Sequence, residues 1–107
     1  MKVNLNLISD FNLETLKRII MSQNSNLIAK IETSNFGQIY QSILEFKEDL
    51  NSVNFIWSLP ENHFENFQKI LNCEEIVIDE LFEEVDIFAD LILQLSKKCK
   101  FIFLANW

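Results

Sequence analysis

The sequence predicts a doubly wound α/β fold on a parallel sheet of about four strands, formed by one domain of residues 1–107. Apolar runs that suit strands alternate along the chain with segments of helical periodicity. Strands joined through helices run parallel, and parallel sheets are covered by helices on both faces. The chain has only one glycine and one proline, which is too few for the many tight turns of an all-β protein.

The first half of the chain predicts two pairs of a strand and a helix. Apolar residues alternate with asparagine at the start of Val3–Ser9, which predicts a strand with one wet face. Asn12 is suited to cap the following helix, and a second strand is expected at Leu27–Thr33. Ser34–Asn35 can cap a second helix, whose apolar residues keep helical spacing as far as Leu50. These residues are Phe36, Ile39, Tyr40, Ile43, Leu44 and Leu50.

The second half predicts a third strand, a short helix, a long helix and a closing strand. Asn51–Ser52 indicates a break before a strand at Val53–Leu59. Pro60 stops strand pairing and suits the first turn of a short helix. The longest helix is expected over about Asp79–Lys98, where apolar residues recur at three- and four-residue steps. The last strand is expected at Phe101–Trp107.

The last predicted strand is apolar and lies at an edge of the sheet. Such an edge invites pairing with another strand. We therefore expect the sheet to be incomplete at its C-terminal edge, with either the remainder of a larger fold or another chain beside it. Trp57 is expected in the core, whereas an apolar tryptophan at the end of the sequence needs a cover. The residues expected at this interface are Phe101, Phe103, Leu104 and Trp107.

Composition restricts the class of partner and the compartment. The formal net charge is −7, which disfavours nucleic acid and anionic membrane because both bind basic surfaces. No segment approaches the roughly 18 apolar residues of a membrane span, and the N-terminal segment lacks the apolar run of a signal peptide. A cytoplasmic protein is expected. Cys73 and Cys99 form no CxxC pair and are expected to be buried free thiols. Neither a cofactor nor a His/Cys metal site is expected.

Candidate functional residues follow the predicted strands, because ligands of parallel sheets bind at the carboxyl ends of the strands. Asp10, preceded by Ser9, is either a functional carboxylate or a turn residue that caps the first helix. Gly37 allows a ligand or a left-handed turn, or is tolerated within the second helix. Asn62 and His63 follow the third strand. The histidine has no identifiable nucleophile or orienting partner, which favours a surface or capping role.

Two further patterns argue against specific binding sites. No GxGxxG or GxxxxGK[ST] motif follows the first strand, which disfavours a loop that cradles a nucleotide phosphate. An acidic stripe along the last helix is explained by a solvated helix face better than by a cation site. It consists of Asp79, Glu83, Asp86 and Asp90.

Four segments together resemble the N-terminal region of FkbH-type proteins. They are Leu7–Leu16, Asn54–Glu61, Glu84–Leu91 and Phe103–Trp107. In that family a flavodoxin-like domain similar to SGNH hydrolases precedes a haloacid-dehalogenase-like domain. Members act in polyketide and surface-carbohydrate biosynthesis, and the best-known activity loads a glyceryl unit onto an acyl carrier protein. The resemblance covers most of this chain but only the first part of such a protein.

The chain departs from the hydrolase pattern at the nucleophile. SGNH hydrolases carry Gly-Asp-Ser after the first strand, whereas this chain has Ser9-Asp10-Phe11, so that Phe11 stands at the nucleophile position. The resemblance makes Gly37 a counterpart of the oxyanion glycine and Asn62 a loose counterpart of the asparagine. The Asp-x-x-His block and the downstream Asp-x-Asp motif have no counterpart here. Ester hydrolysis would therefore lack both nucleophile and base.

Three functions agree with these observations. The first is a non-catalytic SGNH-like segment of an FkbH-type protein that positions a carrier protein or a downstream catalytic domain, although an acidic surface suits an acidic carrier protein poorly. The second is a stand-alone interaction module, such as a homo-oligomer, that pairs through its last strand. The third is a small hydrolase that uses Ser9 or Ser58 with His63.

Overall fold

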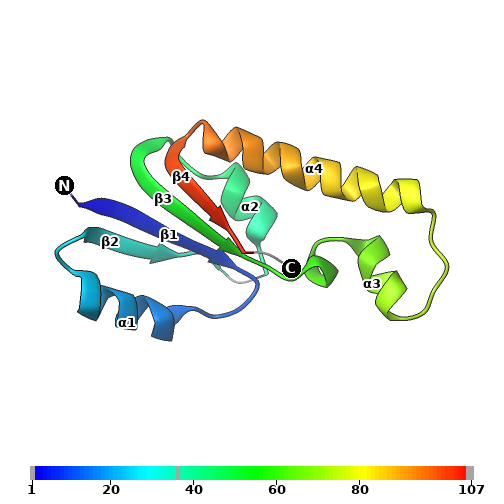
Figure 1. Ribbon diagram of the computed structural model, residues 1–107, viewed down its shortest axis with the longest axis horizontal. Coiled ribbons are helices and arrows are strands. Elements are labelled where there is room, and N and C mark those ends of the chain that lie inside the picture. Colours follow the sequence, from blue (N-terminus) through cyan, green and yellow to red (C-terminus); the bar gives the residue numbers. More distant parts are fainter. Residues whose placement is uncertain (1, 36, 106–107) are drawn as a thin grey trace.

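The computed structural model describes residues 2–35 and 37–105 and contains a four-stranded sheet with helices on both faces (Figure 1). All strand pairs are parallel, and the strand order is β2-β1-β3-β4. The predicted fold class is confirmed, and the sheet is of the flavodoxin-like kind. In chain order, the elements are β1 (Val3–Ser9), α1 (Glu14–Asn24), β2 (Ile28–Thr33), α2 (Ile39–Leu44), β3 (Asp49–Trp57), the 3-10 turn η1 (Pro60–Asn62), α3 (Glu65–Leu71), α4 (Ile78–Ser96) and β4 (Cys99–Leu104).

The sheet separates two apolar cores. Leu7 and Ile8 are neighbours in β1, and because side chains alternate along a strand they enter different cores. The core beneath α1 joins Leu7 to Leu13, Ile28 and Ile31. The larger core lies beneath α2 and α4. Its buried members are Ile8, Ile39, Ile43, Ile56, Phe64, Phe88, Leu95 and Cys99.

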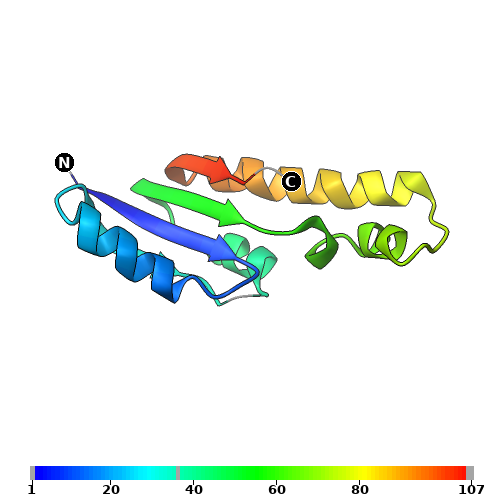
Figure 2. The same cartoon turned by 60° about the horizontal axis from the view of Figure 1, so that its bottom comes forward.

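The helix α1 covers only half of its face of the sheet. In Figure 2 it lies in front of the strands at the N-terminal side, whereas no described element lies in front of β3 and β4. This open half carries an aromatic surface, in which Phe55 stacks on Phe103 at 6.4 Å between ring centroids and Trp57 contacts Phe11 edge-on at 5.1 Å. Phe101 of β4 pairs with Val53 of β3, so its side chain points to the same face of the sheet, where it is 57% exposed. The aromatic surface comprises Phe11, Phe55, Trp57, Phe101 and Phe103.

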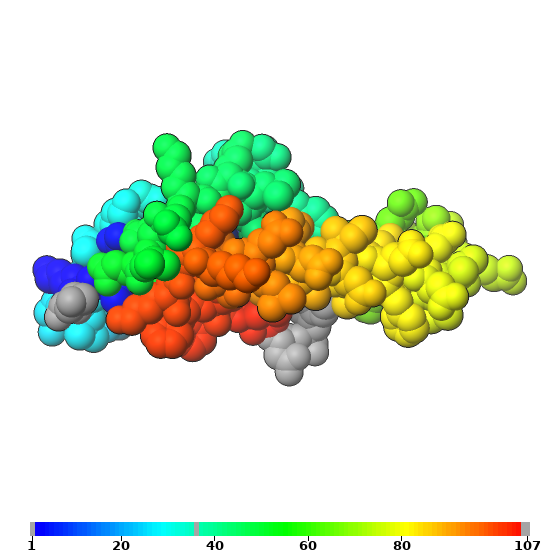
Figure 3. Space-filling view, turned by 90° about the horizontal axis from the view of Figure 1, so that it is seen from above, coloured from blue at the N-terminus to red at the C-terminus, as the bar shows by residue number. Residues whose placement is uncertain are grey.

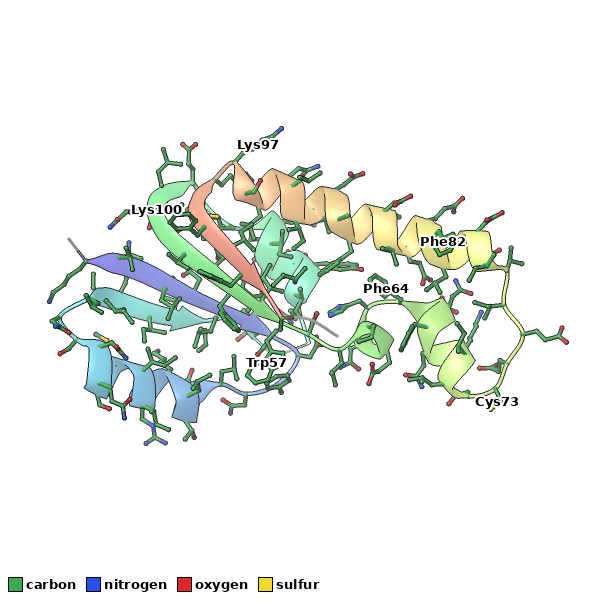
Figure 4. All side chains as sticks on the ribbon, viewed as in Figure 1. Trp57, Phe64, Cys73, Phe82, Lys97 and Lys100 are labelled. Atoms are coloured by element: carbon green, nitrogen blue, oxygen red, sulfur yellow. The ribbon has the colours of Figure 1, made fainter. Side chains whose placement is uncertain are left out.

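The placement of Trp57 differs from the prediction. Its side chain is 41% exposed rather than part of the core. Alternation along β3 turns it to the face that α1 occupies, but α1 packs on β2, two strands away. Figure 4 shows Trp57 near the loop that joins β1 to α1. Trp57 therefore lies in a strand, as predicted, and it is exposed because no described element covers this half of the face.

The second helix is shorter and the third strand longer than predicted. The prediction that the helix extends to Leu50 is wrong, because β3 already begins at Asp49. The Asn51 backbone N–H donates to Asp49 Oδ1 at 3.0 Å, and Ser52 Oγ donates to the Asp49 carbonyl at 2.7 Å. The register between β3 and β4 also shifts directly after Asp49. The predicted break at these residues is a bulge inside β3.

The second helix also begins at Ile39 rather than directly after Ser34–Asn35, and the short helix expected from Pro60 is divided into η1 and α3. The last strand differs from its prediction as well. That strand begins earlier and ends at Leu104, and Trp107 lies outside the described residues. The predicted burial of both thiols is half correct. Cys99 is buried, whereas Cys73 is exposed in a turn after α3, where its backbone φ is 58°.

The helix α4 places its acidic stripe in solvent and anchors itself through Phe88 and Leu95. The four acidic residues Asp79, Glu83, Asp86 and Asp90 are exposed, as a solvated helix face requires. Within residues 2–35 and 37–105, no helix combines the length and apolarity needed to cross a membrane. α3 and the first half of α4 lie side by side and extend past the sheet, which gives the molecule extents of 50 × 28 × 20 Å (Figures 1 and 2).

Candidate functional site

The carboxyl ends of β1 and β3 meet where the winding of the chain changes face. β1 continues through α1 on one face of the sheet, whereas β2 continues through α2 on the other. In open parallel sheets, this switch point forms the crevice in which ligands bind. Asp10 follows β1, and Asn62 and His63 follow β3. We call the residues that meet here the switch-point site, which comprises Asp10, Gly37, Tyr40, Asn62 and His63.

A single carboxylate oxygen connects the two strand ends. Asp10 Oδ2 accepts hydrogen bonds from the Leu59 backbone N–H at 2.9 Å and from Asn62 Nδ2 at 3.2 Å. The Asp10 backbone N–H donates to the Trp57 carbonyl at 3.4 Å. In place of the capping role considered for Asp10, Asn12 Oδ1 accepts the Glu14 backbone N–H at 2.9 Å from the residue before the N-cap, Leu13. Asp10 thus holds the β3–η1 segment against β1.

His63 lies against the same carboxylate oxygen. The distance from His63 Nε2 to Asp10 Oδ2 is 3.3 Å, and both side chains are only 5% exposed. His63 Nε2 has no hydrogen-bond partner among the described residues, so its contact with the carboxylate is electrostatic. Burial lowers the pKa of His63 below its ordinary value of 6.5, and the neighbouring Asp10 offsets part of this effect. The imidazole is therefore favoured in its neutral form at neutral pH.

The imidazole of His63 packs in a cluster with the rings of Tyr40 and Phe88, which also lie 5.8 Å apart between their own centroids. Tyr40 stacks on it at 5.6 Å between centroids, and Phe88 at 5.5 Å with an interplanar angle of 11°. The prediction of a surface histidine is wrong, although its backbone does cap η1 through an N–H donated to the Pro60 carbonyl. Burial and the charge of Glu84 raise the pKa of Tyr40 above its ordinary value of 10.0, so the phenol stays protonated.

The switch-point site borders a pocket of about 340 Å³. Four residues that the sequence singled out separately line this one pocket, namely Asp10, Gly37, Asn62 and His63. The remaining lining comes from the start of α2 and the loop before it: Gln38, Ile39, Tyr40 and Gln41. The structure therefore brings most of the predicted candidates together in space.

The two serines considered as nucleophiles are both buried. Ser9 is 2% exposed and its hydroxyl donates to the Phe11 carbonyl. Ser58 is 1% exposed. Neither serine lines the pocket beside His63. Phe11, which occupies the nucleophile position of the hydrolase pattern, packs on Trp57 in the aromatic surface. A hydroxyl that attacks a substrate must be reached by that substrate, which these positions do not allow.

Gly37 adopts a backbone conformation that other residues rarely reach. Its φ is 76°, and no atom lies within 4 Å of the position that a Cβ would take. Of the roles considered for this residue, the structure therefore selects the left-handed turn before α2. Backbone conformation, rather than lack of space for a side chain, requires the glycine.

The site contains a carboxylate, a neutral imidazole, a phenol and an amide. These groups can hold a small polar molecule by hydrogen bonds, and neither Ser9 nor Ser58 is exposed beside them. Among the residues of 2–35 and 37–105, no group of three or more His, Cys, Asp or Glu side chains is arranged to hold a metal ion. The hydrogen bonds accepted by Asp10 join the ends of β1 and β3 at this corner of the sheet.

Sequence reasoning missed the aromatic residues that pack against His63. Tyr40 and Phe88 fit the helical spacing of core residues, and nothing in their spacing distinguishes a ring that faces His63 from one that faces leucine. The charge of Glu84 raises the pKa of Tyr40. The sequence alone does not distinguish Glu84 from the other acidic residues of α4. Only the fold brings these three residues near the end of β3.

In comparisons with known proteins, no family model matches the chain, and no curated protein or solved structure gives a significant match. The FkbH-type resemblance therefore stays a prediction that rests on the quoted segments alone.

Proposed function

We propose that this chain is a non-catalytic α/β interaction module, the role that the FkbH-type resemblance implies for an SGNH-like N-terminal segment. The observation that carries the proposal is the use of Asp10. Its carboxylate Oδ2 accepts bonds from Leu59 and Asn62 and lies against His63, so it joins the ends of β1 and β3. In a hydrolase the equivalent corner presents a nucleophile, and here Phe11 stands in that place.

The surface beside the last strand supports a protein partner. Phe101, Phe103 and Leu104 are 57%, 56% and 48% exposed, and contiguous exposed apolar surface is typical of interaction sites. A net charge of −7 favours an apolar or basic partner surface over nucleic acid, an anionic membrane or an acidic carrier protein. We propose such a protein partner, or the remainder of a longer chain, in the cytoplasm.

An ester-hydrolysis assay tests the absence of catalysis. We expect the 107-residue chain to hydrolyse p-nitrophenyl acetate no faster than an equal concentration of its His63→Gln variant, because neither Ser9 nor Ser58 lines the pocket beside His63. Ser9→Ala and Ser58→Ala are expected to give the same rate, and the exposed Ser96→Ala serves as the matched control.

Saturable hydrolysis that His63→Gln and one of the two buried-serine variants abolish, but Ser96→Ala retains, would contradict the proposal. It would establish the small-hydrolase alternative, since loss on removal of either partner is the behaviour of a nucleophile and its base.

A further inference from the structure

One side of the molecule combines an unprotected strand edge with an apolar helix flank. The sheet has two edge strands, β2 and β4. β2 carries Lys30 and Glu32 as exposed side chains that pair with each other at 3.1 Å, and charged residues on an edge oppose pairing with other strands. β4 has no charge after Lys100. Only the edge of β4 is therefore left suited to further pairing.

The outer edge of β4 has hydrogen-bonding groups at alternate residues. The Ala105 backbone N–H donates to the Ile56 carbonyl at 2.9 Å and so faces β3. Alternation along a strand then directs the backbone groups of Ile102 and Leu104 away from β3. Within residues 2–35 and 37–105, no strand pairs with this outer edge.

The helix α4 adds an exposed apolar flank on the same side. Its Glu84 faces α2 and α3, since it accepts from Asn66 of α3 and raises the pKa of Tyr40 of α2. Helical spacing places a row of exposed residues on the flank that faces away from α2, toward the edge of the sheet. This row, which we call the α4 flank, comprises Ile78, Phe82, Val85, Ala89 and Leu93. Figure 3 shows β4 in red and α4 in orange and yellow as one continuous face.

We propose that this face binds a second copy of the chain through a two-fold contact in which β4 pairs antiparallel with β4 and the α4 flank packs against itself. This inference rests on the proposed role as an interaction module and names the partner. A two-fold axis at Ile102 pairs Lys100 with Leu104 of the other copy in hydrogen-bonded positions. Phe101 then lies opposite Phe103 of the other copy in the closer, non-hydrogen-bonded position, which favours aromatic pairs.

The two ends of α4 carry opposite charges, and this distribution favours a second copy despite the net charge of −7 on each chain. α4 is acidic along its first part, with exposed residues from Asp79 to Asp90, whereas Lys97, Lys98 and Lys100 follow its end. Figure 4 shows Lys97 and Lys100 toward one end of the molecule and Phe82 toward the other. A two-fold contact runs the two α4 helices antiparallel, so the acidic part of each approaches the lysines of the other.

Sedimentation velocity of the full chain from about 1 µM to about 1 mM tests the proposal. We expect a concentration-dependent species of twice the 12.6 kDa monomer mass. Leu93→Glu, on the α4 flank and 61% exposed, is expected to weaken the dimer at least about tenfold by burying a charge. Ile87→Glu is the matched control, since Ile87 is 59% exposed on the opposite flank of the same helix.

A second variant addresses the strand edge without relying on the helix. Leu104→Pro removes an outward N–H and leaves the bonds to β3 in place, so it is expected to weaken the dimer while far-UV circular dichroism stays unchanged. A wild-type chain that stays monomeric throughout, or a dimer that withstands both Leu93→Glu and Leu104→Pro, would overturn the proposal. Either result leaves the absence of hydrolysis intact, so the two proposals fail separately.

Discussion

At the end of β1, one oxygen of Asp10 accepts the Leu59 backbone N–H and the Asn62 side-chain amide and lies 3.3 Å from His63 Nε2. A charged acceptor forms stronger hydrogen bonds than a neutral one. The two donors and the imidazole all come from the segment that follows β3. The residue that sequence reasoning ranked first as a functional carboxylate is therefore, in our account, the link between the two central strands.

His63 makes stability depend on pH. Its pKa in the folded protein lies below 6.5 because burial disfavours the imidazolium, and the unfolded chain binds the proton more tightly. Its contribution to stability is therefore fully present above the unfolded pKa and is lost as the pH falls below it. We expect the free energy of unfolding, measured by urea titration, to decrease between about pH 7 and pH 5.5.

The comparison variant is His63→Phe, which keeps a ring packed against Tyr40 and Phe88. Because His63 is the only histidine of the chain, this variant should show a flatter dependence in the same range. The titratable groups that face the imidazole, Asp10 and Tyr40, are present in both proteins, so a difference in slope reports on His63. Equal slopes for both proteins would show that His63 is not buried as described.

At the scale of elements, Glu84 fastens α3 to α4. The Asn66 backbone N–H lies 3.3 Å from Glu84 Oε2, and Asn66 Nδ2 donates to Oε1 at 3.0 Å. We expect Glu84→Ala to loosen α3, since it leaves the buried Asn66 amide without its acceptor. Amide hydrogen exchange in Glu65–Leu71 should accelerate by roughly tenfold, while exchange in β1 and β3 changes little.

Glu83→Ala is the control for the contact between Glu84 and Asn66, because Glu83 is the adjacent residue and lies on the exposed acidic stripe. Exchange in α3 should stay at the wild-type rate in this variant. If both variants accelerated exchange equally, general loss of acidic charge from α4, and not the contact with Asn66, would be the cause.

Most elements could be predicted because their signals are local. Asn12 accepts the first backbone N–H of α1 and Pro60 opens η1, and both effects operate within a few residues. The start of β3 could not, because pairing with Cys99, distant in the sequence, helps to fix it. Leu50 lies seven residues after Ile43, which is also a helical spacing. Local pattern thus gave a helix where a long-range strand contact prevails.

At the scale of the whole molecule, the topology explains which site residues could be predicted. Parallel strands bring their carboxyl ends to one edge, so Asp10, Asn62 and His63 could be expected near one another without knowledge of any distance. Trp57 could not be placed, because alternation identifies the face of a side chain but not whether a helix covers it. The structure places α1 over β1 and β2, which leaves most of the aromatic surface on β3 and β4 exposed.

The central claim is that Asp10 joins β1 to β3 and does not serve catalysis, and the free energy of unfolding of Asp10→Ala tests it most directly. We expect urea unfolding at pH 7 to show a loss of about 1.5–3 kcal/mol relative to wild type, since two hydrogen bonds to a charged acceptor disappear. Asp86→Ala, on the exposed stripe of α4, should change stability by less than about 0.5 kcal/mol. An Asp10→Ala variant as stable as wild type, or more stable, would contradict the account, because that is the behaviour of a residue kept for function at the expense of stability.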